Sequence, residues 1–484
     1  MIHSANSVIG SSTLQEIRAN KFGPATNKRP QDVSNKEYQL SSLILREIHK
    51  TIKVMLTVAS NPEESKTSSL RYWLTNSSKS RDFLLILLIV FGCLYFRRPD
   101  AFYNAQLYDE DGTDYLSGFE HYGIKAIILP LNQYIQLVPH LLAVIFGLLS
   151  INLLYIPFCY NISCFILTVF IACKLWESAN YLGLKFKILY ATCFLIVPVG
   201  PDMYMNLPNI QWFLSLYIID YLFIGYKIGG KYLKLIPIFL FSFTGPITLL
   251  LSPLILLIMF LDRKKLETPN FIAYLVMLSS GLIDLITQLK SGIRHRSSVQ
   301  IKPSFALPPE HLHLLKVIIN NFKDILFLNS KHFSSFSSAL ISNICLIAFA
   351  TIMAFTLLNY KKITNNRKYV LLIAAVLYFV SYVLAFWPQE SKLTAFTVAR
   401  YYLIPYNCIF WIAILAWDKA IQWWWIALYL IFFYKHSGNM KSILYDKHWK
   451  QQVEEYYQGT RDTFYINEGG ANWGWEFVLP KRKK

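Results

Sequence analysis

Long apolar runs constrain the fold of this chain more than any other feature of its sequence. Runs of this kind lie at 82–96 and near 153–173, 187–200, 210–225, 235–261, 270–290, 338–358, 368–386, 401–417 and 420–434. Charged residues make up 16% of the chain, against about 25% in soluble domains, and 54% of residues are apolar. This pattern predicts many helices packed in lipid. It excludes a fully soluble enzyme, a secreted miniprotein and a plain nucleic-acid-binding domain.

The basic residues lie between the apolar runs. A formal net charge of +18 would suit a nucleic-acid partner if Lys and Arg formed one face. Basic cytoplasmic loops of a polytopic membrane protein explain the excess without such a partner. We therefore expect the lipid bilayer, and no nucleic acid, as a partner. The seven cysteines show neither CxxC nor zinc spacing, so they indicate no metal site.

The first 80 residues form a separate polar region. They contain neither an apolar run of spanning length nor the apolar core of a signal peptide. Residues 38–58 have helical apolar spacing with basic residues between, which suits an amphipathic surface helix; a partly ordered cytoplasmic tail fits equally well. Lys79 and Arg81 precede the first run and place the N-terminus in the cytoplasm. The chain thus divides into an extension at 1–80, a transmembrane domain at 81–434 and a terminal segment at 435–484.

The stretch 134–149 decides the topology. It is apolar but short, and it contains Pro139 and His140. If it lies in the outer interface, the short cytoplasmic loops carry 14 Lys and Arg and the short outer loops carry 2. A spanning 134–149 would reverse this distribution, against the positive-inside rule. We predict an all-α polytopic membrane protein with about eleven spans, an interfacial helix and an outer C-terminal segment. The run 235–261 has two basic ends and should turn back at Gly245-Pro246.

The first long outer segment, 97–133, contains the densest acidic cluster, Asp109, Glu110, Asp111 and Asp114. On composition alone, a solvated acidic turn explains it. Carboxylates near a membrane surface are partly desolvated and repel one another, and both effects raise proton affinity as a general base requires. Neighbours in an extended chain point to opposite sides. Either Glu110 faces the site while Asp109 and Asp111 face elsewhere, or the reverse holds.

Two further groups suggest binding roles. Asn209 and Gln211 put neutral hydrogen-bonding groups beside Trp212, which suits a sugar, although an interfacial aromatic belt explains Trp212 equally well. Arg400, with Lys392 eight residues earlier, lies at the outer start of a span. It could bind the phosphate of a lipid carrier or anchor to headgroups.

Several short motifs lie along the chain in the acidic segment, the interfacial stretch, the later apolar runs and the C-terminal segment. They are Tyr108-Asp109-Glu110-Asp111-Gly112, Gln133-Tyr134, Val138-Pro139-His140-Leu141, Asn209-Ile210-Gln211-Trp212, Thr244-Gly245-Pro246, Arg400-Tyr401-Tyr402, Ile466-Asn467 and Trp473-Gly474-Trp475. Together they resemble the membrane-embedded glycosyltransferases of the GT-C superfold, and within it the bacterial serotype-converting (O-antigen-modifying) glucosyltransferases. The likeness covers roughly 83–478. It departs from the family at Pro139-His140, where Pro-Arg would be expected.

The resemblance implies an inverting hexosyltransferase in the bacterial inner membrane, with 81–434 as its catalytic domain and 435–484 as a periplasmic cap. It would move a sugar, glucose in the first instance, from undecaprenyl-phosphate-sugar to lipopolysaccharide O-antigen or another periplasmic glycan. Glu110, Asp111 or Asp109 would be the general base in a reaction with an oxocarbenium-like transition state. The substrate-binding residues would be Arg400, Lys392, Tyr401, His140, Asn209, Gln211 and Trp212. No metal is required, although the acidic cluster could hold Mg²⁺ or Mn²⁺.

Other classes of membrane protein compete with this interpretation. A lipid-linked glycan flippase or transporter often shows internal repeats and ionisable residues inside its spans. We see no clear repeat, and Asp220 and Asp284 have no evident partner in the sequence. An O-antigen polymerase or ligase typically uses a large, late, Arg-rich outer loop, whereas 291–337 is not strongly basic. A non-catalytic scaffold is the third alternative.

Overall fold

The computed structural model describes ten stretches of the chain: 77–108, 110–131, 134–197, 203–224, 235–263, 266–292, 370–378, 403–416, 446–467 and 474–480. The chain divides into two compact units, Met1–Ile52 and Lys53–Lys484, and all described residues belong to the second. Of these residues, 77% are helical, which confirms the prediction of a mainly helical protein. The segments expected at 38–58, 338–358 and 420–434 lie outside the described residues.

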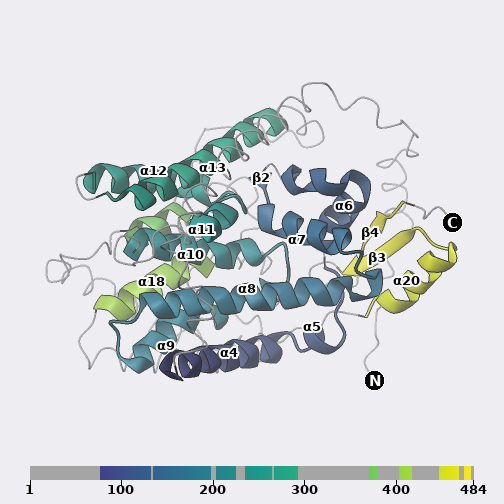
Figure 1. Ribbon diagram of the computed structural model, residues 1–484, viewed down its shortest axis with the longest axis horizontal. Helices are drawn as coiled ribbons and strands as arrows, with labels where there is room; N and C mark the ends of the chain where they lie inside the picture. Colours follow the sequence, from purple (N-terminus) through teal and green to yellow (C-terminus); the bar gives the residue numbers. More distant parts are fainter. Residues whose placement is uncertain are drawn as a thin grey trace, which may run out of the picture. The chain divides into compact units, whose positions relative to one another are not determined.

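Apolar helices form most of the described fold (Figure 1), together with a helical stretch at 370–378. They are α4 (Ser77–Arg97), α8 (Ile156–Ser178), α9 (Leu184–Thr192), α10 (Ile210–Ile224), α11 (Leu235–Ser242), α12 (Ile247–Leu261), α13 (Thr268–Gly292) and α18 (Leu403–Ala416). Within the described residues, two stretches are long and apolar enough to cross a membrane, Leu153–Ser178 and Thr268–Leu289. The total of about eleven spans stays a prediction.

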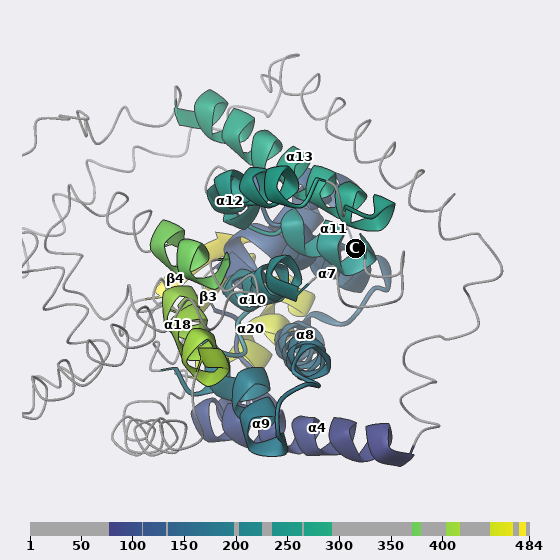
Figure 2. The same cartoon turned by 90° about the vertical axis from the view of Figure 1, so that its left-hand side faces the viewer.

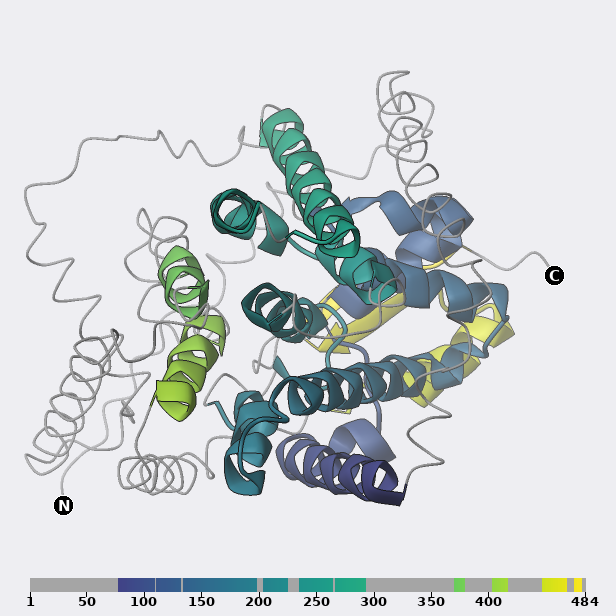
Figure 3. The ribbon, with the colours of Figure 1, turned by 60° about the vertical axis from the view of Figure 1, so that its left-hand side comes forward.

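Helix α10 lies at the centre of this arrangement. All of its residues except Trp212 are buried, as expected of a helix that is apolar on every side. It packs against α8, α11 and α18, and Figures 2 and 3 show it between α8 and α11. Asp220, its acidic residue, accepts hydrogen bonds from the Ser178 hydroxyl (2.5 Å) and the Tyr190 hydroxyl (2.7 Å). Tertiary pairing thus satisfies an acid that has no partner close by in the sequence.

Short elements connect α4 to α8. In chain order they are α5 (Asp100–Tyr103), the π-helix η2 (Asp111–Leu116), α6 (Ser117–Tyr122), the 3₁₀-helix η3 (Gly123–Ile128), the strands β1 (Pro130–Leu131) and β2 (Tyr134–Ile135), and α7 (Leu137–Leu148). With 12 residues, α7 is shorter than the ~20 needed to span a bilayer. It packs against η2, η3 and α6. Its predicted location in the interface stays a prediction.

The C-terminal segment folds into a helix and a hairpin. Helix α20 (Trp449–Gln458) precedes the antiparallel strands β3 (Thr463–Asn467) and β4 (Gly474–Val478), which pair from Thr463–Val478 to Asn467–Gly474. The rings of Phe464 and Phe477 stack with centroids 5.3 Å apart. The Trp449 indole donates to the Leu153 carbonyl over 3.1 Å, so the segment is joined to the chain just before α8.

The hairpin also touches the acidic turn. Strand β4 packs against η2, and a Cβ atom added to Gly112 would lie 2.6 Å from the Phe477 ring. Only glycine therefore permits this approach between the π-helix and the hairpin.

The predicted break in the 235–261 run is confirmed. Helix α11 ends at Ser242 and α12 begins at Ile247, and both pack against α13. Between them, Gly245 adopts φ +91°, and its N–H donates to the Ile135 carbonyl over 2.8 Å. A positive φ is accessible to glycine without steric cost, and Pro246 follows where α12 starts.

We expect Gly245→Ala to destabilise the protein by about 1–3 kcal/mol, because alanine is strained at this φ and its Cβ would overlap the side-chain oxygen of Gln211. Thermal unfolding followed by tryptophan fluorescence in detergent would measure the change. Gly183→Ala is the matched control, since Gly183 has φ −62° and open space around the added atom. Equal unfolding midpoints for the two variants would contradict the role given to Gly245.

Candidate functional site

The acidic turn is helical rather than extended. Asp111 opens η2, so the predicted alternation of side chains is wrong there, because the π-helix winds these residues around an axis. Asp111 is 2% exposed, and its Oδ2 accepts from the Tyr108 N–H over 3.2 Å. Glu110 is half-buried. Asp109 lies outside the described residues.

Burial perturbs the acid–base properties of this turn. Desolvation raises the pKa of the half-buried Asp114 carboxyl above its ordinary value, and a hydrogen bond from Thr113 opposes the rise. Desolvation, together with the negative charges of Glu110 and Asp111, places the pKa of Tyr115 well above its usual range. Tyr115 therefore keeps its proton and donates it in a hydrogen bond to the side-chain oxygen of Gln136.

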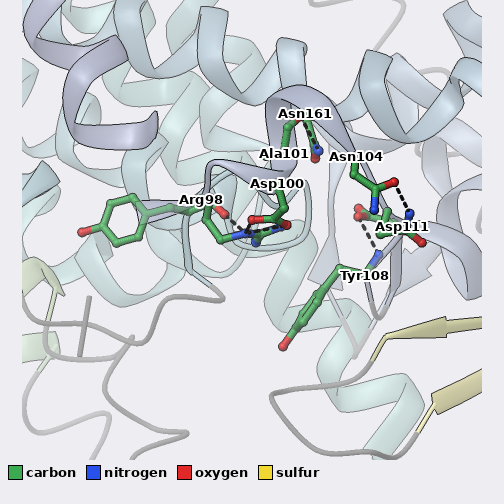
Figure 4. A network of polar contacts seen from close by, with 9 residues as sticks. Arg98, Asp100, Ala101, Asn104, Tyr108, Asp111 and Asn161 are labelled. Carbon is green, nitrogen blue, oxygen red and sulfur yellow. Dashed lines mark hydrogen bonds and ion pairs between the residues drawn. The ribbon is translucent and has the colours of Figure 1, made fainter. Parts of the chain in front are cut away.

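Two buried arginines lie where α4 ends, Arg97 as its last residue and Arg98 directly after it, and sequence analysis did not select them. Arg98 is paired with Asp100, with Nη2 3.0 Å from Oδ2, and its Nη1 donates to the Tyr204 carbonyl. Arg97 donates to the Val197 carbonyl over 2.8 Å and lies 4.0 Å over the Tyr204 ring. Figure 4 shows the Arg98–Asp100 pair with the neighbouring Tyr108–Asp111 contact. A signal was present in the sequence, because two arginines directly follow the first apolar run.

The residues 134–140, which we call the junction segment, connect several motifs that are far apart in the sequence. The N–H of Leu137 donates to the Phe243 carbonyl over 2.9 Å, and the N–H of Val138 donates to the Thr244 hydroxyl over 3.1 Å. Gln136 pairs with Thr244 in an isolated antiparallel β-bridge, and its side-chain oxygen accepts a hydrogen bond from the Tyr115 hydroxyl. The acidic turn and the break between α11 and α12 thus meet at the junction segment.

Two further helices reach the junction segment. The Gln211 amide of α10 donates to the Pro208 carbonyl over 3.0 Å and to the Tyr134 hydroxyl over 3.5 Å. On α13, Asp284 Oδ1 accepts from the Ile135 N–H over 3.2 Å. Sequence analysis treated Asp284 as an isolated acid, because its partner is 149 positions away.

His140 lies on the first turn of α7 and is 2% exposed. Its ring stands perpendicular to the Tyr115 ring, with centroids 5.0 Å apart. Desolvation lowers the pKa of His140 to about 4, so the imidazole is neutral at physiological pH.

The predicted binding residues divide into two groups. His140 and Gln211 contact or belong to the junction segment, while Asn209 is buried in the turn before α10, where its carbonyl accepts from the Trp212 N–H over 3.1 Å. Lys392, Arg400 and Tyr401 lie outside the described residues. Among the residues that the structure describes, no three His, Cys, Asp or Glu side chains are grouped closely enough to hold a metal ion.

Comparisons of the chain with protein-family models, curated proteins and solved structures found no match.

His140→Phe should weaken the pH dependence of stability. The unfolded chain binds a proton on this residue near pH 6.5 and the folded chain only near pH 4, so wild-type stability is constant above pH 6.5 and falls between pH 6.5 and 4. Complete loss of this contribution amounts to on the order of 3 kcal/mol. Denaturant unfolding of both proteins at pH 7.5 and 4.5 would measure it. The same fall in both would show that His140 protonates freely in the folded state.

Proposed function

We propose that the chain is a membrane-embedded inverting glycosyltransferase of the bacterial inner membrane. It would move a sugar, with glucose as the first candidate, from undecaprenyl-phosphate-sugar to a periplasmic glycan such as O-antigen. The observation that carries the proposal is the acidic turn with its buried Asp111, which is linked through Tyr115 and Gln136 to the junction segment. A carboxylate connected to the ends of apolar helices suits a reaction between a lipid-borne donor and an aqueous acceptor.

The surrounding helices support a lipid-borne donor. Leu153–Ser178 and Thr268–Leu289 have the length and apolarity of membrane helices, and Leu256, Phe260 and Leu282 expose apolar side chains on α12 and α13. Exposed apolar side chains along such helices suit contact with lipid chains. Strand β4 of the C-terminal segment packs against η2, which also packs against α7, so the acidic turn lies between the short apolar helix α7 and a small cap.

The proposed step is a single displacement. Glu110 or Asp111 takes the proton of an acceptor hydroxyl as that oxygen forms a bond to the anomeric carbon. The bond from the anomeric carbon to the phosphate oxygen breaks, and the phosphate leaves with the electron pair. The transition state resembles an oxocarbenium ion, and one displacement inverts the anomeric configuration.

The leaving phosphate needs positive charge. Arg400 and Lys392 would supply it, as the sequence predicts. Arg98 is a weaker candidate, because Asp100 already offsets its charge. The displacement itself needs no metal, and binding of Mg²⁺ or Mn²⁺ by the acidic cluster stays a prediction.

Glu110→Gln and Asp111→Asn test the general base. We expect the variant that removes the base to lower sugar transfer by about 100-fold or more, because general base catalysis typically contributes that much. The assay follows radiolabelled glucose from undecaprenyl-phosphate-glucose into glycan in membranes containing the protein. Glu120→Gln is the control, since Glu120 is an exposed acid on the neighbouring helix α6 and should transfer at the wild-type rate.

Undiminished transfer by both variants would contradict the assigned base. Mass spectrometry of surface polysaccharide from cells with and without the protein tests the function more broadly. An unchanged glycan in cells that make the lipid-linked donor would favour the flippase or scaffold alternatives.

The orientation can be tested separately. Lys125 is exposed on η3, just after the acidic turn. In the proposed orientation, Lys125→Cys in intact spheroplasts should react with a membrane-impermeant maleimide, with the unsubstituted chain as the blank. Reaction only after the membrane is opened would place the acidic turn in the cytoplasm and end the proposal.

A further inference from the structure

Three buried polar atoms lie in or against the junction segment, and none has a hydrogen-bond partner in the part of the chain that the structure describes. They are Nδ1 and Nε2 of His140 and Oδ2 of Asp284. His140 is 2% exposed and Asp284 is 1% exposed. An unsatisfied buried polar group costs about 1–3 kcal/mol, and a charged group costs more. Apolar side chains at these positions would make a more stable protein, so the two residues indicate a ligand.

Both residues are held against the same short backbone stretch. Asp284 Oδ1 accepts from the Ile135 N–H over 3.2 Å, which fixes the carboxyl group from the α13 side. The His140 N–H donates to the Gln136 carbonyl over 3.1 Å, which fixes the first turn of α7. The two attachment points belong to adjacent residues, Ile135 and Gln136, whose Cα atoms are about 3.8 Å apart across a trans peptide bond. A single small molecule is large enough to contact both side chains.

The chemistry of the neighbouring side chains identifies the class of ligand. Tyr115, Tyr134, Gln136 and Gln211 are neutral hydrogen-bonding groups. A neutral imidazole offers one donor and one acceptor, and a carboxyl oxygen accepts hydroxyl protons. Sugar hydroxyls both donate and accept. A phosphate would gain no positive charge from His140, because burial lowers the pKa of the imidazole to about 4.

We propose that His140 and Asp284 bind hydroxyl groups of the transferred hexosyl unit, and that they form the sugar subsite of the transferase. This inference rests on the proposed function and deepens it. It assigns Asp284 a role for which sequence analysis gave no argument, and it specifies the sugar as the part of the substrate that His140 binds. The hydrogen bond from Tyr115 to Gln136 places this subsite beside the acidic turn, where the anomeric carbon must meet the base.

Binding can be measured without any transfer reaction. The purified full chain is placed in lipid nanodiscs, and native mass spectrometry compares its affinity for undecaprenyl-phosphate-glucose with that for undecaprenyl phosphate. We expect the wild type to prefer the glucose-bearing lipid by about tenfold or more, as two or three satisfied polar atoms would give. Asp284→Asn and His140→Phe should each reduce this preference to about threefold or less, and their affinity for undecaprenyl phosphate should be unchanged.

The matched control is Asp220→Asn. Asp220 is also a buried acid in an apolar helix, but Ser178 and Tyr190 already satisfy it. Nine residues, or about 13 Å along α10, separate it from Gln211. This variant should keep the wild-type preference even if it is less stable. Unchanged affinity for undecaprenyl phosphate shows that the two subsite variants are folded.

The outcomes separate the subsite from the enzyme. If both subsite variants keep the wild-type preference, the subsite assignment is wrong while the proposed function stands. The subsite is also overturned if the wild type binds undecaprenyl phosphate carrying glucose, galactose or N-acetylglucosamine no more tightly than undecaprenyl phosphate itself. If the preference is present and both variants lose it, the subsite is supported. Absence of transfer in the separate radiolabel assay would then count against the enzyme alone.

Discussion

The pairing between the junction segment and the break after α11 is the interaction on which the described site depends. Backbone groups at a break between two apolar helices leave the helical hydrogen-bond pattern and must find other partners. The N–H of Gly245 and the carbonyl of Phe243 find them at Ile135 and Leu137. Because this bonding uses the chain just before α7, it fixes the start of α7 against α11 and α13. The Asp284 carboxylate and the His140 backbone are both bonded to this stretch, at the adjacent residues Ile135 and Gln136.

Apolar periodicity was sufficient to predict the helices but not the contacts between them. The run at 210–225 corresponds to α10 within a residue or two, because a helix that is apolar on all sides is recognisable from composition alone. The break at Gly245-Pro246 was predictable because glycine and proline have strong local preferences. The partner of Asp284 was not, since a hydrogen bond to Ile135 depends on how α13 packs and leaves no local signal in the sequence.

The acidic turn and the end of α4 show a second limit of the sequence. Four acidic residues within 109–114 favoured an extended, solvated loop, yet η2 winds Asp111 into the interior beneath the hairpin of β3 and β4. At the end of α4, two arginines open a long segment predicted to lie outside the membrane, where solvated charges would be expected. Arg98 is instead buried and offset by Asp100 two residues later. Position in the sequence alone does not distinguish a buried, paired arginine from a solvated one.

Burial also bears on the choice between the two acids of the turn. Asp111 accepts a hydrogen bond from the Tyr108 backbone, so one of its carboxylate oxygens already has a partner. It is also 2% exposed, so an acceptor glycan arriving from water has little access to it. Glu110 precedes it by one residue and is only half-buried, so its longer side chain can reach an incoming hydroxyl. Within the proposed function, this geometry favours Glu110 as the general base. Asp111 would then hold the π-helix in place and contribute negative charge near the developing oxocarbenium ion.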